Sequence, residues 1–218
     1  MTSKEIVLQT IEFRNKDQRV PRDLWMLPWT ADHFPEQIKK LRQDFTWDIS
    51  SPTAICTPSP LVKGDPYQVG EYVDDWGSQN DLLIHPDLWD EFFKPMYRDY
   101  IQIAHSHGKK MFMHSDGHIL RIIPKLIDLG LDVLNSQIFC MGIENLEQFA
   151  GKITFWGEID RQHLLCTGTL EEIDNAVEKV YKTLWKDGGC IAQCEFGPGG
   201  KPDNVYRLYE KWTQVRGK

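Results

Sequence analysis

Residues 108–137, GKKMFMHSDGHILRIIPKLIDLGLDVLNSQ, decide the fold. They predict a short apolar strand at 110–113, a helix at 119–129 that ends at Gly130, and a second apolar strand at 132–134. Two short apolar strands joined by a helix are typical of a βαβ unit, in which the strands run parallel.

The same alternation continues to the end of the chain. It predicts strands at 153–156 and 190–193, and helices at 143–150, 169–186 and 202–215. The helix at 169–186 has the clearest signal, because Thr169 and Glu172 are spaced as a capping box.

Upstream of residue 108 the pattern is less regular. A capped helix opens the chain, and a strand at 20–26, a helix from residue 35 and a strand at 67–76 follow. A long helix is predicted at 86–107, and Pro95 should bend or split it.

Polar side chains follow every predicted strand of the regular part: His114 and Asp116, Asn135 and Gln137, Glu158, Asp160 and Arg161, and Cys194 and Glu195. Functional side chains that come from the ends of several strands are typical of a TIM-type (β/α)8 barrel. No Gly-x-Gly-x-x-Gly segment follows a strand, which argues against a nucleotide-binding doubly wound sheet. The sequence therefore favours an α/β barrel, but only five or six strands can be counted, so the barrel is incomplete.

The composition of the chain argues against several classes of function. The 218 residues carry 25 basic and 32 acidic side chains, a net charge of −7, which disfavours nucleic acid as a partner. No apolar run is long enough to span a membrane, and no secretory signal opens the chain. Five cysteines, an odd number, suggest a reducing compartment. We expect a cytoplasmic protein that acts on a small molecule.

In their order, the motifs resemble the uroporphyrinogen decarboxylase superfamily, which also contains corrinoid-dependent methyltransferases. The segments that carry the resemblance are DDWGSQN at 74–80, HSHGKK at 105–110, HSDG at 114–117, LGLDVLN at 129–135 and FWGEID at 155–160. The resemblance covers essentially the whole chain as one domain, 1–218. It implies that the middle of the family's barrel is missing, with an internal deletion near 70–80. A naturally compact relative is the alternative.

The resemblance also implies chemistry. The methyltransferase branch binds zinc through a His-x-Cys segment and a later cysteine, and His114, Asp116 and Cys194 stand in those places. Zinc accepts imidazole, thiolate and carboxylate ligands, and could hold a thiolate as a methyl acceptor. The implied reaction is methyl transfer between a corrinoid carrier, on its own protein partner, and a thiol or folate acceptor.

Other residues of the same strand ends complete the expected site. Glu158 and Glu195 are candidate proton acceptors, although an acid near Arg161 is also typical of a structural ion pair. The candidate substrate-binding residues are Asp75, Trp76, Asn135, Gln137, Asp160 and Arg161.

Two other functions stay open. The first is metal-free decarboxylation of a porphyrinogen or related acid with Asp75 as the central carboxylate. The family's arginine-rich segment near its first strand is reduced here to Arg22, which counts against a substrate with many carboxylates. The second is an inactive binding or assembly module. Because an incomplete barrel leaves unpaired strand edges, we also expect a homo-oligomer.

Overall fold

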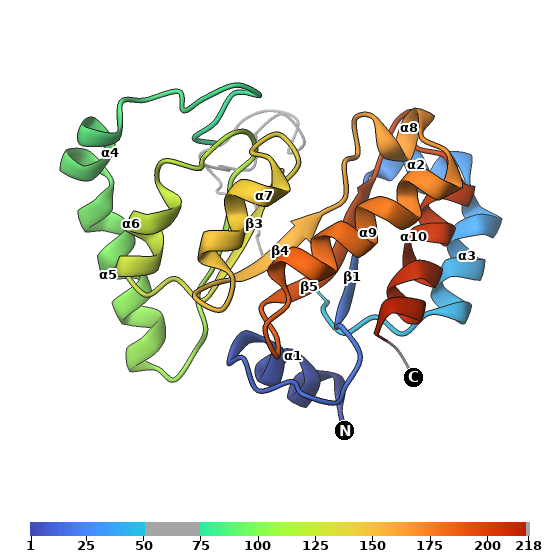
Figure 1. Cartoon of the computed structure of the whole chain (residues 1–218), viewed down its shortest axis with the longest axis horizontal. Coiled ribbons are helices and arrows are strands. Elements are labelled where there is room, and N and C mark those ends of the chain that lie inside the picture. The colour runs from blue at the N-terminus through green and yellow to red at the C-terminus, as the bar shows by residue number, and fades with distance from the viewer. Residues whose placement is uncertain (51–74, 217–218) are drawn as a thin grey trace, which may run out of the picture.

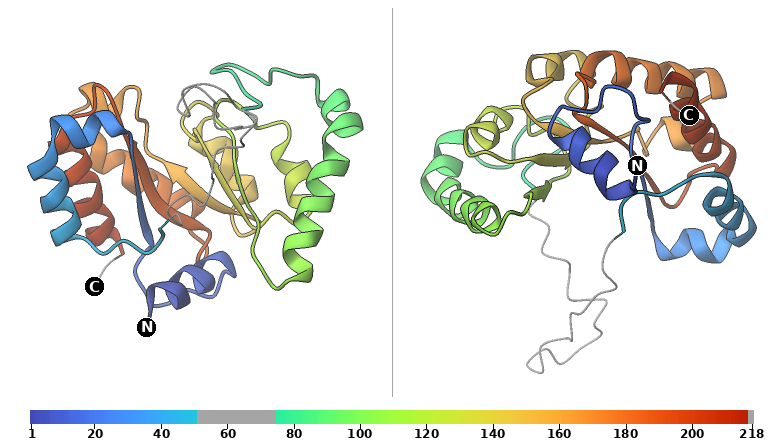
Figure 2. Two further views of the ribbon diagram at one scale, coloured as in Figure 1. Left: turned by 180° about the vertical axis from the view of Figure 1, so that it is seen from behind. Right: turned by 90° about the horizontal axis from the view of Figure 1, so that it is seen from below.

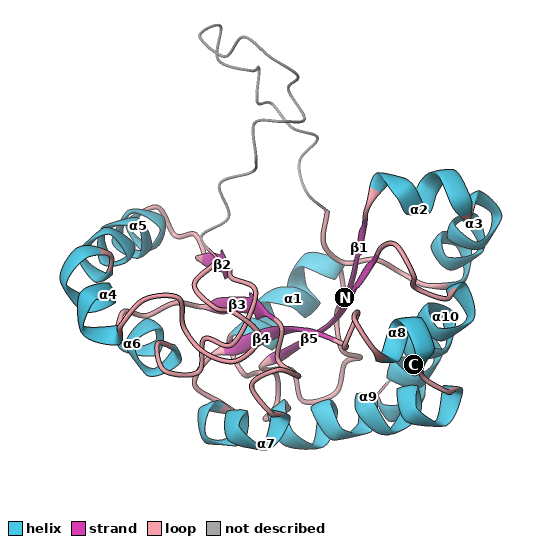
Figure 3. Ribbon diagram, turned by 90° about the horizontal axis from the view of Figure 1, so that it is seen from above, coloured by secondary structure: helices cyan, strands magenta, loops and turns pink. Residues whose placement is uncertain are grey.

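Five parallel strands form one curled sheet in the computed structural model, which describes residues 1–50 and 75–216. The strands are β1 (Arg22–Met26), β2 (Phe112–His114), β3 (Val133–Ser136), β4 (Thr154–Glu158) and β5 (Cys190–Phe196). The sheet bends into an arc with helices along its outer side (Figures 1 and 3). This arrangement is an incomplete TIM-type barrel, as the sequence predicts.

The strand order locates the opening of the arc. The order is β1-β5-β4-β3-β2, so the first strand pairs with the last and not with the second. Pairing of first and last strands is the step that closes a (β/α)8 barrel. The arc therefore opens between β1 and β2, and it has five strands where a closed barrel has eight.

Helices connect the strands and cover the outer face of the arc. The helices of the described residues are α1 (Ser3–Ile11), α2 (Pro28–His33), α3 (Pro35–Asp44), α4 (Pro86–Phe92), α5 (Lys94–Ser106), α6 (Ile123–Asp128), α7 (Ile143–Leu146), the 3-10 turn η1 (Glu147–Phe149), α8 (Leu164–Thr167), α9 (Leu170–Leu184) and α10 (Pro202–Val215). No helix of these residues is both long and apolar enough to cross a membrane.

Local signals explain most helix boundaries. Thr2 with Glu5 and Thr169 with Glu172 form the two predicted capping boxes of α1 and α9. The predicted helix at 86–107 is split into α4 and α5 at Phe93, because Pro95 fits only in the first turn of a helix.

Several predicted boundaries differ from the structure. The two short helices α2 and α8 were not predicted, and α6 begins at Ile123 rather than at residue 119. The predicted strand at 67–76 lies outside the described residues except for Asp75 and Trp76, which belong to no strand. Strands β4 and β5 extend further than predicted, to Glu158 and Phe196.

The core divides into two parts that follow the two faces of the sheet. The main core lies between the sheet and its outer helices, and its largest buried side chains include Trp89, Tyr209 and Trp212. A small second cluster of Val133, Trp156 and Ile191 lies on the inner face, where Ile11 of α1 packs against it. Helix α1 thus covers the end of the arc at which the strands begin (Figure 2, right).

Candidate metal centre and active-site cleft

Side-chain alternation along the strands brings polar groups to one end of the inner face. His114, Asn135 and Trp156 are neighbours across β2, β3 and β4, and Glu158 is the neighbour of Gln193 on β5. Successive residues of a strand point to opposite faces, so residues in register share a face. Asn135 accordingly donates from Nδ2 to the Trp156 carbonyl (2.8 Å) and to Gln193 Oε1 (3.4 Å).

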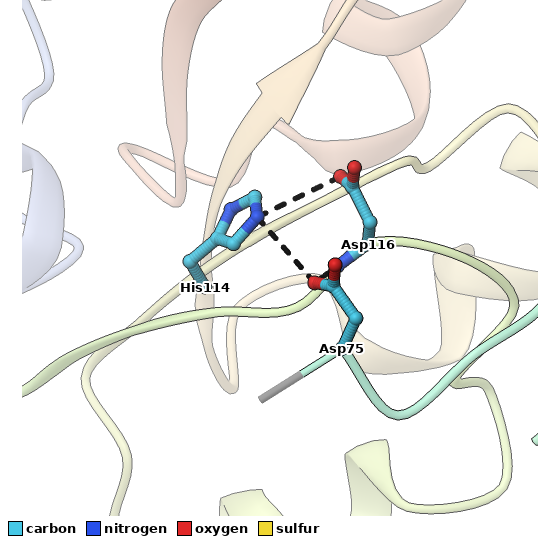
Figure 4. Close-up of side chains that lie close together, drawn as sticks. All are labelled: Asp75, His114 and Asp116. Carbon is cyan, nitrogen blue, oxygen red and sulfur yellow. Dashed lines mark hydrogen bonds and ion pairs between the residues drawn. The ribbon is translucent and has the colours of Figure 1, made fainter. Parts of the chain in front are cut away.

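His114 has one ring nitrogen held by the protein and one directed toward carboxylates. Its Nδ1 lies 2.5 Å from Oδ1 of Asn135. Because Asn135 uses Nδ2 to donate elsewhere, its Oδ1 is the acceptor and His114 Nδ1 carries the proton. The other ring nitrogen, Nε2, lies 3.7 Å from Oδ1 of both Asp75 and Asp116 (Figure 4).

Asp75, His114 and Asp116 form a group that could hold a metal ion. One ligand atom from each lies within 4.8 Å of the others. The Asp116 amide donates to Asp75 Oδ1 over 2.8 Å, and Oδ1 of Asp116 is buried without a hydrogen bond in the described structure. One imidazole and two carboxylates make a hard donor set that suits Zn²⁺ and other divalent ions.

The backbone around this cluster is tightly packed. Gly77 and Gly117 lie so close that a Cβ at Gly117 would be 2.1 Å from the Gly77 carbonyl oxygen, and Gly117 has a φ of +81°. His118 donates its amide to the Ser78 carbonyl over 2.7 Å. These contacts fix residues 75–78 against 115–118, and so fix Asp75 beside Asp116.

Arg161 connects the cluster to two further carboxylates. Its guanidinium forms ion pairs with Asp116 and with Glu195 (3.0 Å), and its Nε lies 3.3 Å from a carboxyl oxygen of Glu158. Burial raises the pKa of Glu158 to about 8; Arg161 opposes this rise, while the charges of Asp116 and Glu195 add to it. Glu158 is therefore protonated at neutral pH.

A cleft of about 890 Å³ opens beside these residues at the carboxyl ends of the strands. Its polar lining comprises Asp23, Asp75, His114, Asp116, Arg161 and Glu195. A second cavity, of about 180 Å³, lies on the other side of Arg161 and is lined by Gln137, Glu158 and Asp160 among others. Most of the predicted site residues thus meet around Arg161.

Three of the predicted substrate-binding residues have structural partners. Gln137 accepts from Gln79 (2.5 Å) and from the Gly117 amide (3.2 Å). Asp160 accepts from two backbone amides, those of Gln162 and His163, at 2.9 Å each. Trp76 donates its indole N–H to the Tyr97 hydroxyl over 2.8 Å and packs between α4 and α5.

The structure does not bring Cys194 to the predicted metal ligands. Cys194 lies within β5 between Gln193 and Glu195, so its side chain points to the opposite face, where its sulfur is 3.5 Å from the Tyr209 hydroxyl. The side chain is fully buried, and burial raises the pKa of its thiol to about 12. The predicted grouping of Cys194 with His114 and Asp116 is therefore not found, and Asp75 lies beside these two residues instead.

Sequence reasoning missed the contribution of β1. Asp23, whose pKa burial raises to about 6, and Trp25 both line the cleft, and Trp25 donates its indole N–H to Asp23 over 2.7 Å. The alternation of Arg22–Met26 was a signal, since a strand at the sheet edge places every second side chain inward.

The chain is similar to known proteins in structure and in sequence. A methyltransferase from Methanosarcina mazei is similar in structure, with a TM-score of 0.49 and 17% sequence identity, over 61% of this chain and 38% of that chain. No curated protein matches significantly. The family model of uroporphyrinogen decarboxylase matches residues 70–214, well over half of the sequence. The chain therefore belongs to the uroporphyrinogen decarboxylase family.

Proposed function

We propose that this protein is a metal-dependent methyltransferase of its family, which moves a methyl group between a corrinoid carrier and a thiol or folate acceptor. The observation that carries the proposal is the convergence of Asp75, His114 and Asp116 within 4.8 Å at the mouth of a large cleft. His114 ends β2, Asp116 lies in the loop after it, and Asp75 lies in the segment before α4; side chains at strand ends commonly form the active sites of barrel enzymes.

The local chemistry fits a zinc ion at these residues. With Nδ1 of His114 held by Asn135, Nε2 is the ring nitrogen that can bind the metal. Asp116 offers a buried Oδ1 that has no hydrogen bond in the described structure. Three protein ligands leave a position open for a substrate, and zinc at such a site lowers the pKa of a bound thiol and holds the thiolate.

The neighbouring residues have distinct roles in this proposal. Asn135 fixes the imidazole of His114, and Arg161 orients Asp116 while neutralising part of the surrounding acidic charge. Glu158 is buried and protonated at neutral pH, so it can give a proton to a departing group rather than take one.

The charge of the cleft favours this reaction over porphyrinogen decarboxylation. Four acidic side chains line the cleft, against a single arginine that is already paired with Asp116 and Glu195. A substrate with many carboxylates needs converging cationic donors. The acidic lining favours a bound cation instead.

Metal content tests the proposal first. Protein purified without chelator is expected to contain about one zinc per chain by elemental analysis, and His114→Ala and Asp116→Ala should lose it because three ligands become two. The matched control is Cys194→Ser, which should retain zinc. Folded wild-type protein without any divalent metal, or loss of zinc only in Cys194→Ser, would contradict the proposal.

Turnover separates the enzyme from a binding module. Methylcobalamin serves as the methyl donor and 2-mercaptoethanol as the acceptor, and the absorbance change of the corrin reports demethylation. We expect turnover that stops with chelator and returns with zinc. Zinc-loaded protein without turnover would leave the binding-module alternative, and chelator-resistant release of CO₂ from a porphyrinogen would favour the decarboxylase.

A further inference from the structure

An aromatic wall bridges the opening of the arc. Trp25 on β1, Phe112 on β2 and Trp156 on β4 make up this wall, and their ring centroids are 4.6–6.5 Å apart. Strands β1 and β2 are the two outer strands of the sheet, so these rings reach across the gap between them. Phe112 keeps 37% of its surface exposed, and both Trp25 and Phe112 line the 890 Å³ cleft.

The remaining lining of this cleft is acidic. Asp23, Asp75, Asp116 and Glu195 line it together with Trp25 and Phe112 of the wall, and Arg161 is the only lysine or arginine among the described lining residues. Arg161 forms ion pairs with two of these carboxylates, so its charge is already balanced. The cleft therefore carries excess negative charge next to aromatic rings.

This combination identifies a class of ligand. An aromatic face attracts a cation through its quadrupole, and a quaternary ammonium ion, which cannot donate hydrogen bonds, loses little hydration when its methyl groups contact rings. A hydrated metal cation would be attracted by the carboxylates but would make no favourable contact with the wall. A neutral apolar ligand would make favourable contacts with the wall alone. A methylated ammonium ion gains from both.

We propose that this cleft binds a methylated ammonium ion, with its methyl groups against Trp25 and Phe112 and its charge balanced by the carboxylates of Asp23, Asp75 and Glu195. The ring of Trp25 is also 5.5 Å from that of His114, so the wall adjoins the metal cluster. The ligand would therefore place its methyl groups beside the candidate metal centre.

As methyl donor this ligand would take the place of the corrinoid carrier in the proposed function and would rest only on its metal-held thiolate, whereas the binding of the ligand rests on neither. In such a transfer a thiolate sulfur forms the new bond to the methyl carbon, and the carbon–nitrogen bond breaks with its electron pair left on nitrogen. The cation thereby becomes a neutral tertiary amine, and no oxidant or reductant is required. Loss of the charge also weakens the attraction of the product to the acidic cleft.

Calorimetric titration of the whole chain with choline, in the presence of chelator, tests binding. The matched ligand is 3,3-dimethyl-1-butanol, which has the shape of choline but no charge. Choline is expected to bind at least about tenfold more tightly, since the ring and carboxylate attractions to the charge together exceed about 1.4 kcal/mol. Equal binding of the two ligands, or binding of neither, would overturn the proposal.

Substitutions in the wall test whether its rings bind choline. Phe112→Leu and Trp25→Leu should weaken choline binding several-fold, while Phe112→Tyr, which keeps the ring, should retain it. Trp29→Leu is the control, because Trp29 stacks on His33 and does not line the cleft. Circular dichroism confirms that each variant is folded. Equal loss in Trp29→Leu and Phe112→Leu, or no loss in either leucine variant of the wall, would also overturn the proposal.

His114→Ala keeps the two proposals apart. This variant removes a metal ligand but no ring of the wall, so choline should still bind after zinc binding is lost. Choline binding in a protein that never holds zinc would leave the ligand proposal standing and remove the proposed function. Zinc binding without choline binding would do the reverse.

Discussion

Cys194 and Glu195 are adjacent in β5, yet they serve different parts of the molecule. Glu195 faces the cleft and pairs with Arg161, whereas Cys194 faces α10 and Tyr209. The family resemblance implies a ligand at Cys194, but the strand continues to Phe196 and alternation decides the direction of each side chain. Because β5 continues three residues beyond its predicted end, Cys194 lies inside the strand and points away from the candidate metal cluster.

The burial of Cys194 gives a labelling prediction. Burial raises the pKa of the Cys190 and Cys194 thiols to about 12, so neither should react with iodoacetamide at pH 8 in the folded protein. Cys166 is partly exposed and should react first among the cysteines that the structure describes. Peptide mass spectrometry, with denatured protein as the positive control, reads out each site. Labelling of Cys194 as fast as Cys166 would mean that its side chain lies on the cleft side.

The raised pKa of Glu158 should make the stability difference between wild type and Glu158→Gln depend on pH. Its pKa is about 8 in the folded protein against an ordinary value of 4.5, so between these values the folded state holds a proton that the unfolded state has lost. The contribution of Glu158 to the free energy of unfolding therefore falls as pH rises from 4.5 to 8, and Glu158→Gln escapes this loss.

Urea unfolding at pH 5, 7 and 9 checks the sign. The free energy of unfolding of Glu158→Gln, relative to wild type, should rise across this range by on the order of a few kcal/mol. Glu91→Gln, at an exposed position of α4, is the control and should show no such trend. A difference that stays constant with pH would contradict the buried, protonated state of Glu158.

At the scale of elements, α9 depends on its cap. Thr169 accepts the Glu172 amide over 3.2 Å, and Glu172 accepts the Thr169 amide over 2.8 Å. Thr169→Ala should therefore lower the free energy of unfolding by about 1 kcal/mol. Glu171→Gln, in the same turn but outside the box, should change it by only a few tenths of a kcal/mol. Equal effects of both substitutions would contradict a specific role for the box.

Elements with strong local signals were the ones that sequence predicted well. Helix α10 has its predicted limits because Pro202 begins it, and α4 and α5 separate where Pro95 requires it. Helices α2 and α8 span only six and four residues, too few for a periodic pattern to show. The proposed ligand role of Asp75 depends on the contact between residues 75–78 and 115–118, which no local pattern encodes.

At the scale of the whole molecule, the arc leaves two outer strands. The outer edge of β1 is partly covered, because Asp48 exchanges hydrogen bonds with the Arg22 backbone. On the other side, β2 contributes three residues and pairs only with β3 in the described sheet. The internal deletion near 70–80 stays a prediction, and the strand order places the opening in the same part of the chain, between β1 and β2.

We predict self-association of the chain because of these two outer strands. Backbone groups at a strand edge readily pair with another chain, so we expect a dimer or larger homo-oligomer. Light scattering coupled to size exclusion, at dilutions into the micromolar range, measures the mass. A monomer that unfolds in one sharp transition would contradict this expectation and show that the wall and Asp48 suffice to protect the edges.

The most direct test of the account is anomalous X-ray diffraction at the zinc edge, from crystals soaked with zinc. We predict one strong anomalous peak per chain, within coordination distance of His114 Nε2 and of a carboxylate oxygen from both Asp75 and Asp116. An anomalous peak at Cys194 and Tyr209, or no peak in crystals whose Asp75, His114 and Asp116 side chains are well ordered, would contradict the metal centre.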